Sequence, residues 1–277
     1  MVARVPRSAA VFGALVCAAV AACSSTGAPP SSAPASGSVA ANVAASATPA
    51  ESLTIYHADP AQVELIASSG RRVLIDVWDP TLLSKPVTAD DILLTTHSHE
   101  DHYDAAFVDA FPGQKITFEE GQINLADVSI VSIPAVHDEG QSPMPKDGSD
   151  YIFIIDIAGF RVGHFGDLGQ DRLTDEQMVE IGKVDIAFSQ LYNPYSTMDE
   201  VNQKGFNQMK QVKPLIFVPT HFNTDTARLA AKTWKAVFSV APVTITRSQL
   251  PTETTVLFLG LHADSYGAML NLEPASW

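Results

Sequence analysis

The run of ten residues from Thr95 to Asp104 limits what this chain can fold into more than any other stretch does. It holds three of the eight histidines of the chain, and its candidate ligands are His97, His99, Asp101 and His102. Imidazole and carboxylate groups bind zinc and similar divalent ions, and four of them in one short loop meet at little cost in loop-closure entropy. The apolar residues 92–95 predict a strand that ends where the run begins, which is a rigid place to mount a site. The sequence therefore predicts a metal site, against the alternative of a polar surface turn that is rich in histidine.

Three other predicted strands also end close to a residue that can bind a metal. The apolar segments 128–133, 160–165 and 215–219 predict strands. The candidate ligands that follow them are His137, Asp167 and His221. Four separate strand ends therefore present ligand-type side chains.

The remaining patterns predict a layered α/β fold. Further strands are expected at residues 53–56, 63–67, 72–76, 115–118, 123–125, 151–157, 184–188, 243–246, 255–259 and 268–272. Helices are expected at residues 104–111, 174–181 and 198–212, and from a cap at Thr224 or Asp225 through Trp234 to Phe238. Residues 138–150 predict a mobile loop near His137. Strands dominate the first half of the chain and alternate with helices in the second, which favours two sheets between helices over one parallel sheet.

The N-terminal part of the chain has the pattern of an export signal followed by a tether. Residues 1–22 combine two arginines with an apolar stretch, which predicts a signal peptide. The small residues before Cys23 resemble the lipobox of bacterial lipoproteins, so we expect Cys23 to be lipidated; the alternative is an ordinary cleavage site beside a coincidental cysteine. Residues 23–51 are then a flexible Ser/Ala/Pro linker, and residues 52–277 form one folded domain. The predicted protein is exported and anchored to the outer face of the cell membrane or in the cell envelope.

Charge and cysteine content limit the classes of partner. The formal net charge of the full chain is −14 at pH 7, which argues against nucleic acid as a substrate and against a polybasic contact with anionic lipid. Membrane association would therefore depend on the lipid anchor at Cys23. The two cysteines, Cys17 and Cys23, both lie in the signal region. The folded body then has no disulfide and needs an extensive core.

The order of these motifs resembles the metallo-β-lactamase superfamily. The His-x-His-x-Asp-His run, the later histidine, the Gly-Asp pair and the final histidine carry the resemblance. The chain looks most similar to the lactonase-like branch, of the L-ascorbate-6-phosphate lactonase and N-acylphosphatidylethanolamine phospholipase D type, through residues 73–76, 186–188, 195–199 and 218–224. The resemblance covers residues 53–225 and implies an α/β fold, an αββα sandwich with two mixed β-sheets between helices. Leu168 departs from the pattern, because many relatives have threonine after Gly-Asp.

The resemblance also implies a role for each ligand. It implies that one metal is bound by His97, His99 and His137, that a second is bound by Asp101, His102 and His221, and that Asp167 bridges them. The implied cofactor is Zn²⁺, as one or two ions, with Mn²⁺ as an alternative. Such a metal lowers the pKa of a bound water from about 15.7 to about 7. The hydroxide that forms takes the place of a serine or cysteine nucleophile. Asp101 is the expected catalytic residue, because it could orient the nucleophile or return a proton to the leaving group.

Other histidines and polar residues have roles that the ligand pattern does not assign. His57 is expected to line the site, to lie on the surface or to lie behind the ligands. His164 is an odd number of residues from Asp167 along a strand and so faces the other way, as a core histidine. His262 lies beyond the residues that carry the resemblance, and we expect it either in a loop or at the mouth of the pocket. Further candidates for the substrate pocket are Tyr192, Tyr195 and Asn223.

The sequence thus predicts a metal-dependent hydrolase that uses a metal-bound hydroxide on an ester, lactone, amide or phosphodiester of a small molecule. The main alternative is a non-catalytic lipoprotein in which the same fold binds a metal or a small ligand. The full ligand set favours the enzyme, since a degenerate scaffold would be expected to lose Asp101 or Asp167 first. A redox or oxygenase relative, whose ligands are much the same, is a third alternative.

Overall fold

Two mixed β-sheets form the centre of the chain in the computed structural model, which describes residues 51–137, 149–240 and 242–277. The six-stranded sheet has the order β13 (Val243–Thr246), β1 (Ser52–Ala58), β2 (Gln62–Ala67), β3 (Arg72–Ile75), β4 (Ile92–Thr95), β5 (Gln114–Thr117). The nine-stranded sheet has the order β15 (Glu273–Pro274), β12 (Lys235–Ser239), β14 (Thr255–Leu259), β11 (Ile216–Pro219), β10 (Ile186–Ser189), β9 (Phe160–His164), β8 (Asp150–Ile157), β7 (Val128–Ala135), β6 (Gly121–Asn124). The predicted signal peptide, most of the predicted linker, and residues 138–148 of the predicted loop lie outside the described residues.

Both sheets combine antiparallel and parallel pairs. In the first sheet β1, β2 and β3 are antiparallel, whereas β3, β4 and β5 are parallel. In the second sheet β6 to β9 form an antiparallel meander, and β9, β10, β11, β14 and β12 are parallel. The parallel strands require helical crossovers, which agrees with the alternation of strands and helices in the second half of the sequence.

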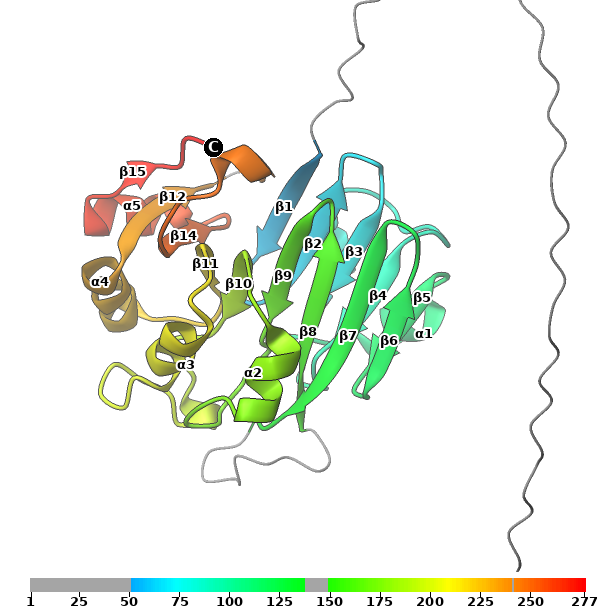
Figure 1. Cartoon of the computed structure of the whole chain (residues 1–277), viewed down its shortest axis with the longest axis horizontal. Helices are drawn as coiled ribbons and strands as arrows, with labels where there is room; N and C mark the ends of the chain where they lie inside the picture. The colour runs from blue at the N-terminus through cyan, green and yellow to red at the C-terminus, as the bar shows by residue number, and fades with distance from the viewer. Residues whose placement is uncertain (1–50, 138–148, 241) are drawn as a thin grey trace, which may run out of the picture. The chain divides into compact units, whose positions relative to one another are not determined.

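The core has the layers that the sequence predicted. Side chains of β1 alternate between buried and half-buried positions, because successive residues of a strand point to opposite faces. The facing sides of the two sheets enclose one apolar cluster that includes Leu53, Val63 and Phe188. A second cluster joins the outer side of the nine-stranded sheet to the helices α2 (Asp175–Ile181), α3 (Lys204–Val212), α4 (Thr224–Thr233) and α5 (Ala263–Leu270). A third joins β3 and β4 to α1 (Ala105–Ala110), so helices lie on both outer sides (Figure 1).

Local sequence signals explain some helix ends and misled the prediction at others. Thr174, the first residue of the predicted helix, is the N-cap of α2 and forms a capping box with Gln177. The predicted helix from residue 198 begins only at Lys204, because a 3₁₀ turn at Pro194–Ser196 and left-handed residues at Thr197 and Gln203 precede it. The N-cap of α4 is Asn223, whose side chain accepts the first backbone N–H groups of the helix.

Two predicted elements near the C-terminus were wrong. The fourth helix ends before Trp234, which is extended, and residues 235–239 form β12 beside β14. The apolar Val237 and Phe238 fitted a helical pattern as well as a strand, and tertiary pairing decides between them. The predicted strand at residues 268–272 is instead the end of α5, which stops at left-handed Asn271.

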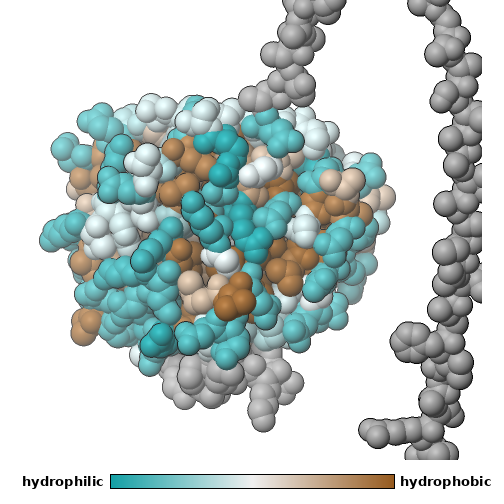
Figure 2. Space-filling view, viewed as in Figure 1, coloured by the Kyte–Doolittle hydropathy of each residue, from teal (hydrophilic) through white to brown (hydrophobic). Residues whose placement is uncertain are grey.

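The visible surface is mostly polar. Figure 2 shows hydrophilic residues spread over the face seen in Figure 1, with smaller apolar areas between them. Among the described residues, no helix combines the length and the apolar character that crossing a bilayer requires.

Candidate metal centre

The predicted ligands follow strands that end at one edge of the two sheets. β7, β9 and β11 run in the same direction, because β7 and β9 are each antiparallel to β8 and because β9, β10 and β11 are parallel. The loops after these strands therefore bring His137, Asp167 and His221 together. The run that contains His97 follows β4 of the other sheet and faces them, with 4.9 Å between the ring centroids of His97 and His137.

The seven side chains form two groups of potential ligand atoms. One group comprises His97, His99, His137 and Asp167, the other comprises Asp101, His102 and His221, and the atoms of each group lie within 4.8 Å of one another. Asp167 lies between the groups. Its Oδ2 is 3.8 Å from Nε2 of His97 and 3.7 Å from Nε2 of His137. Its Oδ1 is 3.3 Å from Nε2 of His102 and 3.3 Å from Nε2 of His221, so each oxygen faces one group, as a bridging ligand requires.

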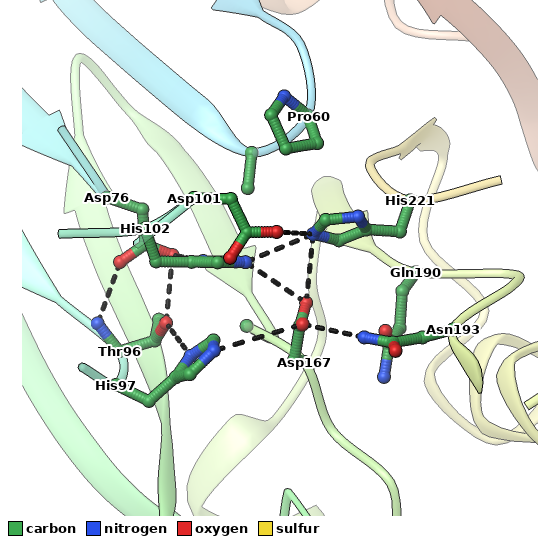
Figure 3. Close-up of polar contacts among 12 residues, drawn as sticks. Pro60, Asp76, Thr96, His97, Asp101, His102, Asp167, Gln190, Asn193 and His221 are labelled. Atoms are coloured by element: carbon green, nitrogen blue, oxygen red, sulfur yellow. Dashed lines mark hydrogen bonds and ion pairs between the residues drawn. The ribbon is translucent and has the colours of Figure 1, made fainter. Parts of the chain in front are cut away.

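A buried carboxylate behind the ligands, Asp76, determines which ring nitrogens face the site. Its Oδ2 accepts hydrogen bonds from His102 Nδ1 and from the Thr96 hydroxyl, each at 2.8 Å, and its Oδ1 accepts from the Thr96 backbone N–H at 2.7 Å. Because the Thr96 hydroxyl donates its proton to Asp76, it can only accept from Nδ1 of His97, which is 2.9 Å away. Both Nδ1 atoms therefore carry protons, so Nε2 is the atom that His97 and His102 can each offer to a metal, once any proton on it is displaced. Figure 3 shows the contacts of both rings.

Unusual backbone positions place the two buried carboxylates. Asp76 follows β3 with a φ of 50°, in the left-handed region that aspartate adopts more readily than most residues. Its backbone N–H donates to Leu94 O at 3.0 Å, which holds the turn against β4. Gly166, with a φ of 51°, turns the chain from β9 into Asp167, and a Cβ there would overlap the carboxylate of Asp150. Geometry therefore requires the glycine of the Gly-Asp pair.

Burial and charge act in opposite directions on the central groups. Burial alone would raise the pKa of Asp167, but the positive charges of His102 and His221 hold that pKa well below its usual range. Burial alone would lower the pKa of His102, but the Asp167 and Asp76 carboxylates raise that pKa well above its usual range. Burial lowers the pKa of His99 and of His221. In the metal-free protein His102 thus holds a proton that a cation must displace.

The donor atoms fit a divalent cation. Tetrahedral zinc with nitrogen ligands at about 2.0–2.1 Å keeps its ligand atoms about 3.3 Å apart. The Nε2 atoms of His102 and His221 are 3.0 Å apart, and both are 3.3 Å from Asp167 Oδ1. The buried Nε2 of His97 makes no hydrogen bond to any described residue, which is costly unless something else binds it. Imidazole and carboxylate donors suit zinc and also manganese.

A cavity of about 480 Å³ opens beside the two groups. Its walls are His99, Glu100, Asp101, Asp167, Tyr192, Asn193, Pro194, Tyr195, His221 and Phe222. Tyr192 and Tyr195 are among them, as the sequence predicted. Asn223 is not, and that prediction was wrong because its side chain is used as the cap of α4, accepting from the backbone N–H groups of Asp225 and Thr226.

The other three histidines lie apart from the ligand groups. His57 is held by backbone carbonyls, with Nδ1 2.6 Å from Leu259 O, and it borders a different pocket. His164 is fully buried with its ring stacked on Phe188, which confirms the predicted core position. His262 is exposed at the start of α5 and does not border the cavity.

Besides Asp76, three residues that support the site were not predicted. The Thr96 hydroxyl relays the hydrogen bond from His97 to Asp76. Asn193 donates from Nδ2 to Asp167 Oδ2 at 2.7 Å. Asp150, whose pKa is raised by burial, places Oδ1 3.4 Å from His97 Nδ1. Isolated polar residues such as these belong to no motif in the sequence. Thr96 is the exception, because it is next to His97 in the histidine run.

Known proteins resemble the chain in sequence and in fold. A metal-dependent hydrolase from Thermoplasma acidophilum is 28% identical over 187 residues, which cover 57% of this chain and 81% of the relative. A solved structure described as a Zn-dependent hydrolase of the metallo-β-lactamase superfamily, from Thermotoga maritima, matches with a TM-score of 0.53 and 19% identity, over 75% of this chain and 99% of that one. A metal-dependent hydrolase from Parabacteroides distasonis matches with a TM-score of 0.52 and 20% identity, over 76% of this chain and 93% of that one. At these identities the two structures show the fold, which is the predicted one.

A family model identifies the chain directly. The model described as a Beta-lactamase superfamily domain matches residues 63–221, which is more than half of the chain. The matched range begins in β2 and ends at His221, and it contains all seven clustered side chains. The chain therefore belongs to the metallo-β-lactamase superfamily.

Proposed function

We propose that the protein is a metal-dependent hydrolase that holds one or two zinc ions, or Mn²⁺ in their place, and cleaves an ester, lactone, amide or phosphodiester of a small molecule. The observation that carries the proposal is the position of Asp167, whose two oxygens face two separate ligand groups beside an open cavity. Membership of the superfamily supports it, as does the relative from Thermoplasma acidophilum, which is named a metal-dependent hydrolase.

The side chains of the site would hold the ions and fix one another. His97, His99 and His137 would bind one ion, Asp101, His102 and His221 the other, with Asp167 shared between them. When bound, such ions supply Lewis acidity and lower the pKa of a coordinated water to about 7. Asp76 keeps the Nε2 lone pairs of two ligands directed at the site, and Asn193 holds one oxygen of Asp167.

Asp101 would carry out the proton transfers of hydrolysis. Its side chain is 43% exposed, lines the cavity, and has Oδ2 3.7 Å from His221 Nε2. A carboxylate there can accept a proton from the attacking water and donate it to the leaving group. Tyr192, Tyr195 and Phe222 would contact the remainder of the substrate and exclude water.

We also propose, on sequence patterns alone, that the protein belongs to the lactonase-like branch and is exported with a lipid on Cys23. Cys23 and the linker lie outside the described residues. The membrane contact would be made by the anchor, since the net charge of −14 opposes adsorption to anionic lipid.

A substrate panel with one isosteric substitution tests the activity. Lactones, aryl esters, N-acyl amides and phosphodiesters are incubated with protein loaded with Zn²⁺ or Mn²⁺. Asp101→Asn is expected to lower turnover at least about 100-fold while the circular dichroism spectrum is unchanged. Asp109→Asn makes the same change on an exposed face of α1 and is the control. Unchanged turnover in Asp101→Asn would remove this residue from the mechanism, and metal binding without turnover of any substrate would favour the non-catalytic alternative.

A further inference from the structure

One acidic side chain at the cavity beside the metal centre belongs to neither ligand group. Of the carboxylates that line the cavity, those of Asp101 and Asp167 would bind the ions and that of Glu100 would not, and the described walls include no lysine or arginine. Lys204 contacts the back of the 194–196 turn, but its Nζ is occupied by Gly169 O at 3.1 Å and by an Asp171 carboxylate oxygen at 3.4 Å. Apart from ions held at the ligand groups, nothing among the described walls would therefore pair with an anionic group of a substrate.

Aromatic side chains and a proline form part of the cavity wall. Tyr192, Pro194, Tyr195 and Phe222 line it, and the Tyr195 side chain is 75% exposed. Phe222 is fixed in place by edge-to-face contacts, with ring centroids 4.7 Å from Tyr266 and 5.3 Å from Phe258. Such a wall offers apolar contact to a ring or chain, and the faces of aromatic rings also attract cations.

Glu100 is the lining acid that has no described structural role. Glu100 is exposed at the cavity, and no hydrogen bond or ion pair is described for its carboxylate. It belongs to neither ligand group. Its charge therefore acts on whatever extends from the metal centre into the cavity, and it repels a negative group there.

We propose that the part of the substrate that extends from the reacting bond carries no negative charge and presents an apolar ring or chain to Tyr192, Tyr195 and Phe222. A sugar phosphate or a dicarboxylate would place its anion beside Glu100 without a cation to pair it, whereas an uncharged or amine-bearing substrate would not. The cavity volume of about 480 Å³ restricts the bound part to a small molecule. This inference rests on the proposed function and narrows its substrate class.

Binding of metal-directed probes tests the inference without requiring turnover. Three benzohydroxamates that differ only in the para substituent, which is methyl, trimethylammonio or carboxylate, are titrated against the zinc-loaded protein. The carboxylate probe is expected to bind at least about tenfold more weakly than the methyl probe, and the difference should shrink between about 0.05 M and about 0.5 M salt. Equal or tighter binding of the carboxylate probe would overturn the inference.

A charge reversal identifies the source of the preference. Glu100→Lys is expected to reduce the discrimination against the carboxylate probe by about tenfold, whereas Glu120→Lys, the same change at an exposed residue outside the cavity wall, should leave it unchanged. An equal effect of both variants would show that only net charge matters and would overturn the role of Glu100. Failure of every ester, lactone, amide and phosphodiester to turn over would contradict the proposed function and leave the order of probe affinities standing.

Discussion

Asp76→Asn tests whether a buried carboxylate controls the metal ligands through their protons. Asp76 accepts three hydrogen bonds on its two oxygens, from the Thr96 N–H, the Thr96 hydroxyl and His102 Nδ1. Asparagine has one acceptor oxygen, so its NH₂ group must replace one of them. If the NH₂ faces the Thr96 N–H, a buried donor is left unpaired, at about 1–3 kcal/mol. If it faces His102 Nδ1, the proton of that ring moves to Nε2, and Thr96 can turn to donate to His97, which blocks both ligand atoms.

In either orientation His102 loses the buried carboxylate that makes its ring a stronger ligand, so metal binding weakens. We expect the zinc affinity of Asp76→Asn to fall about 10- to 100-fold, which corresponds to about 1.4–2.7 kcal/mol. Competition with a chromophoric chelator measures it, and circular dichroism verifies the fold. Asp90→Asn, an exposed position on the same loop, is the matched control. A folded Asp76→Asn protein with the zinc affinity of the parent would refute the argument from tautomers.

Three further predictions concern stability and processing. Burial lowers the pKa of His164 from 6.5 to about 4, so between these pH values the unfolded chain binds a proton that the folded protein does not, and stability falls as the pH falls. In urea titrations, His164→Gln should remove about 2–3 kcal/mol of the stability that the parent loses between pH 7 and pH 4.5. A pH profile of stability like that of the parent would contradict this. Arg72→Met leaves two buried carboxylates unpaired and should lower the free energy of unfolding by about 3–5 kcal/mol, whereas Arg71→Met, which breaks an exposed ion pair, should cost at most about 1 kcal/mol; similar losses would argue against the buried pairs. Acyl labelling in a bacterial host should disappear in Cys23→Ser, and labelling that persisted would refute the lipobox.

The architecture could be predicted because its signals are local and repeated. Strands such as residues 63–67 and 151–157 alternate or run apolar over a length typical of strands, and their ends were correct to within a few residues. Residues 235–239 show the limit. Their apolar side chains are compatible with a helix or a strand, and only the pairing with β14, which is distant in sequence, selects the strand.

The ligands could be predicted because metal chemistry restricts the residue types and because several of them share one short run. The residues behind them could not, since Asp76, Asn193 and Asp150 act through contacts between segments far apart in the sequence. Asp76 appeared in the sequence only as the end of a strand. Its position next to His102 depends on the parallel pairing of β3 with β4, which the sequence did not specify.

The metal content of the purified protein tests the central claim most directly. The full chain is expressed with zinc or manganese available, dialysed against metal-free buffer and analysed by mass spectrometry of the elements. The two ligand groups predict about one to two ions per chain, and substitution of Asp167, which faces both groups, should reduce that number. Less than about a tenth of an ion per chain in the parent protein would contradict the metal centre and the hydrolase that depends on it.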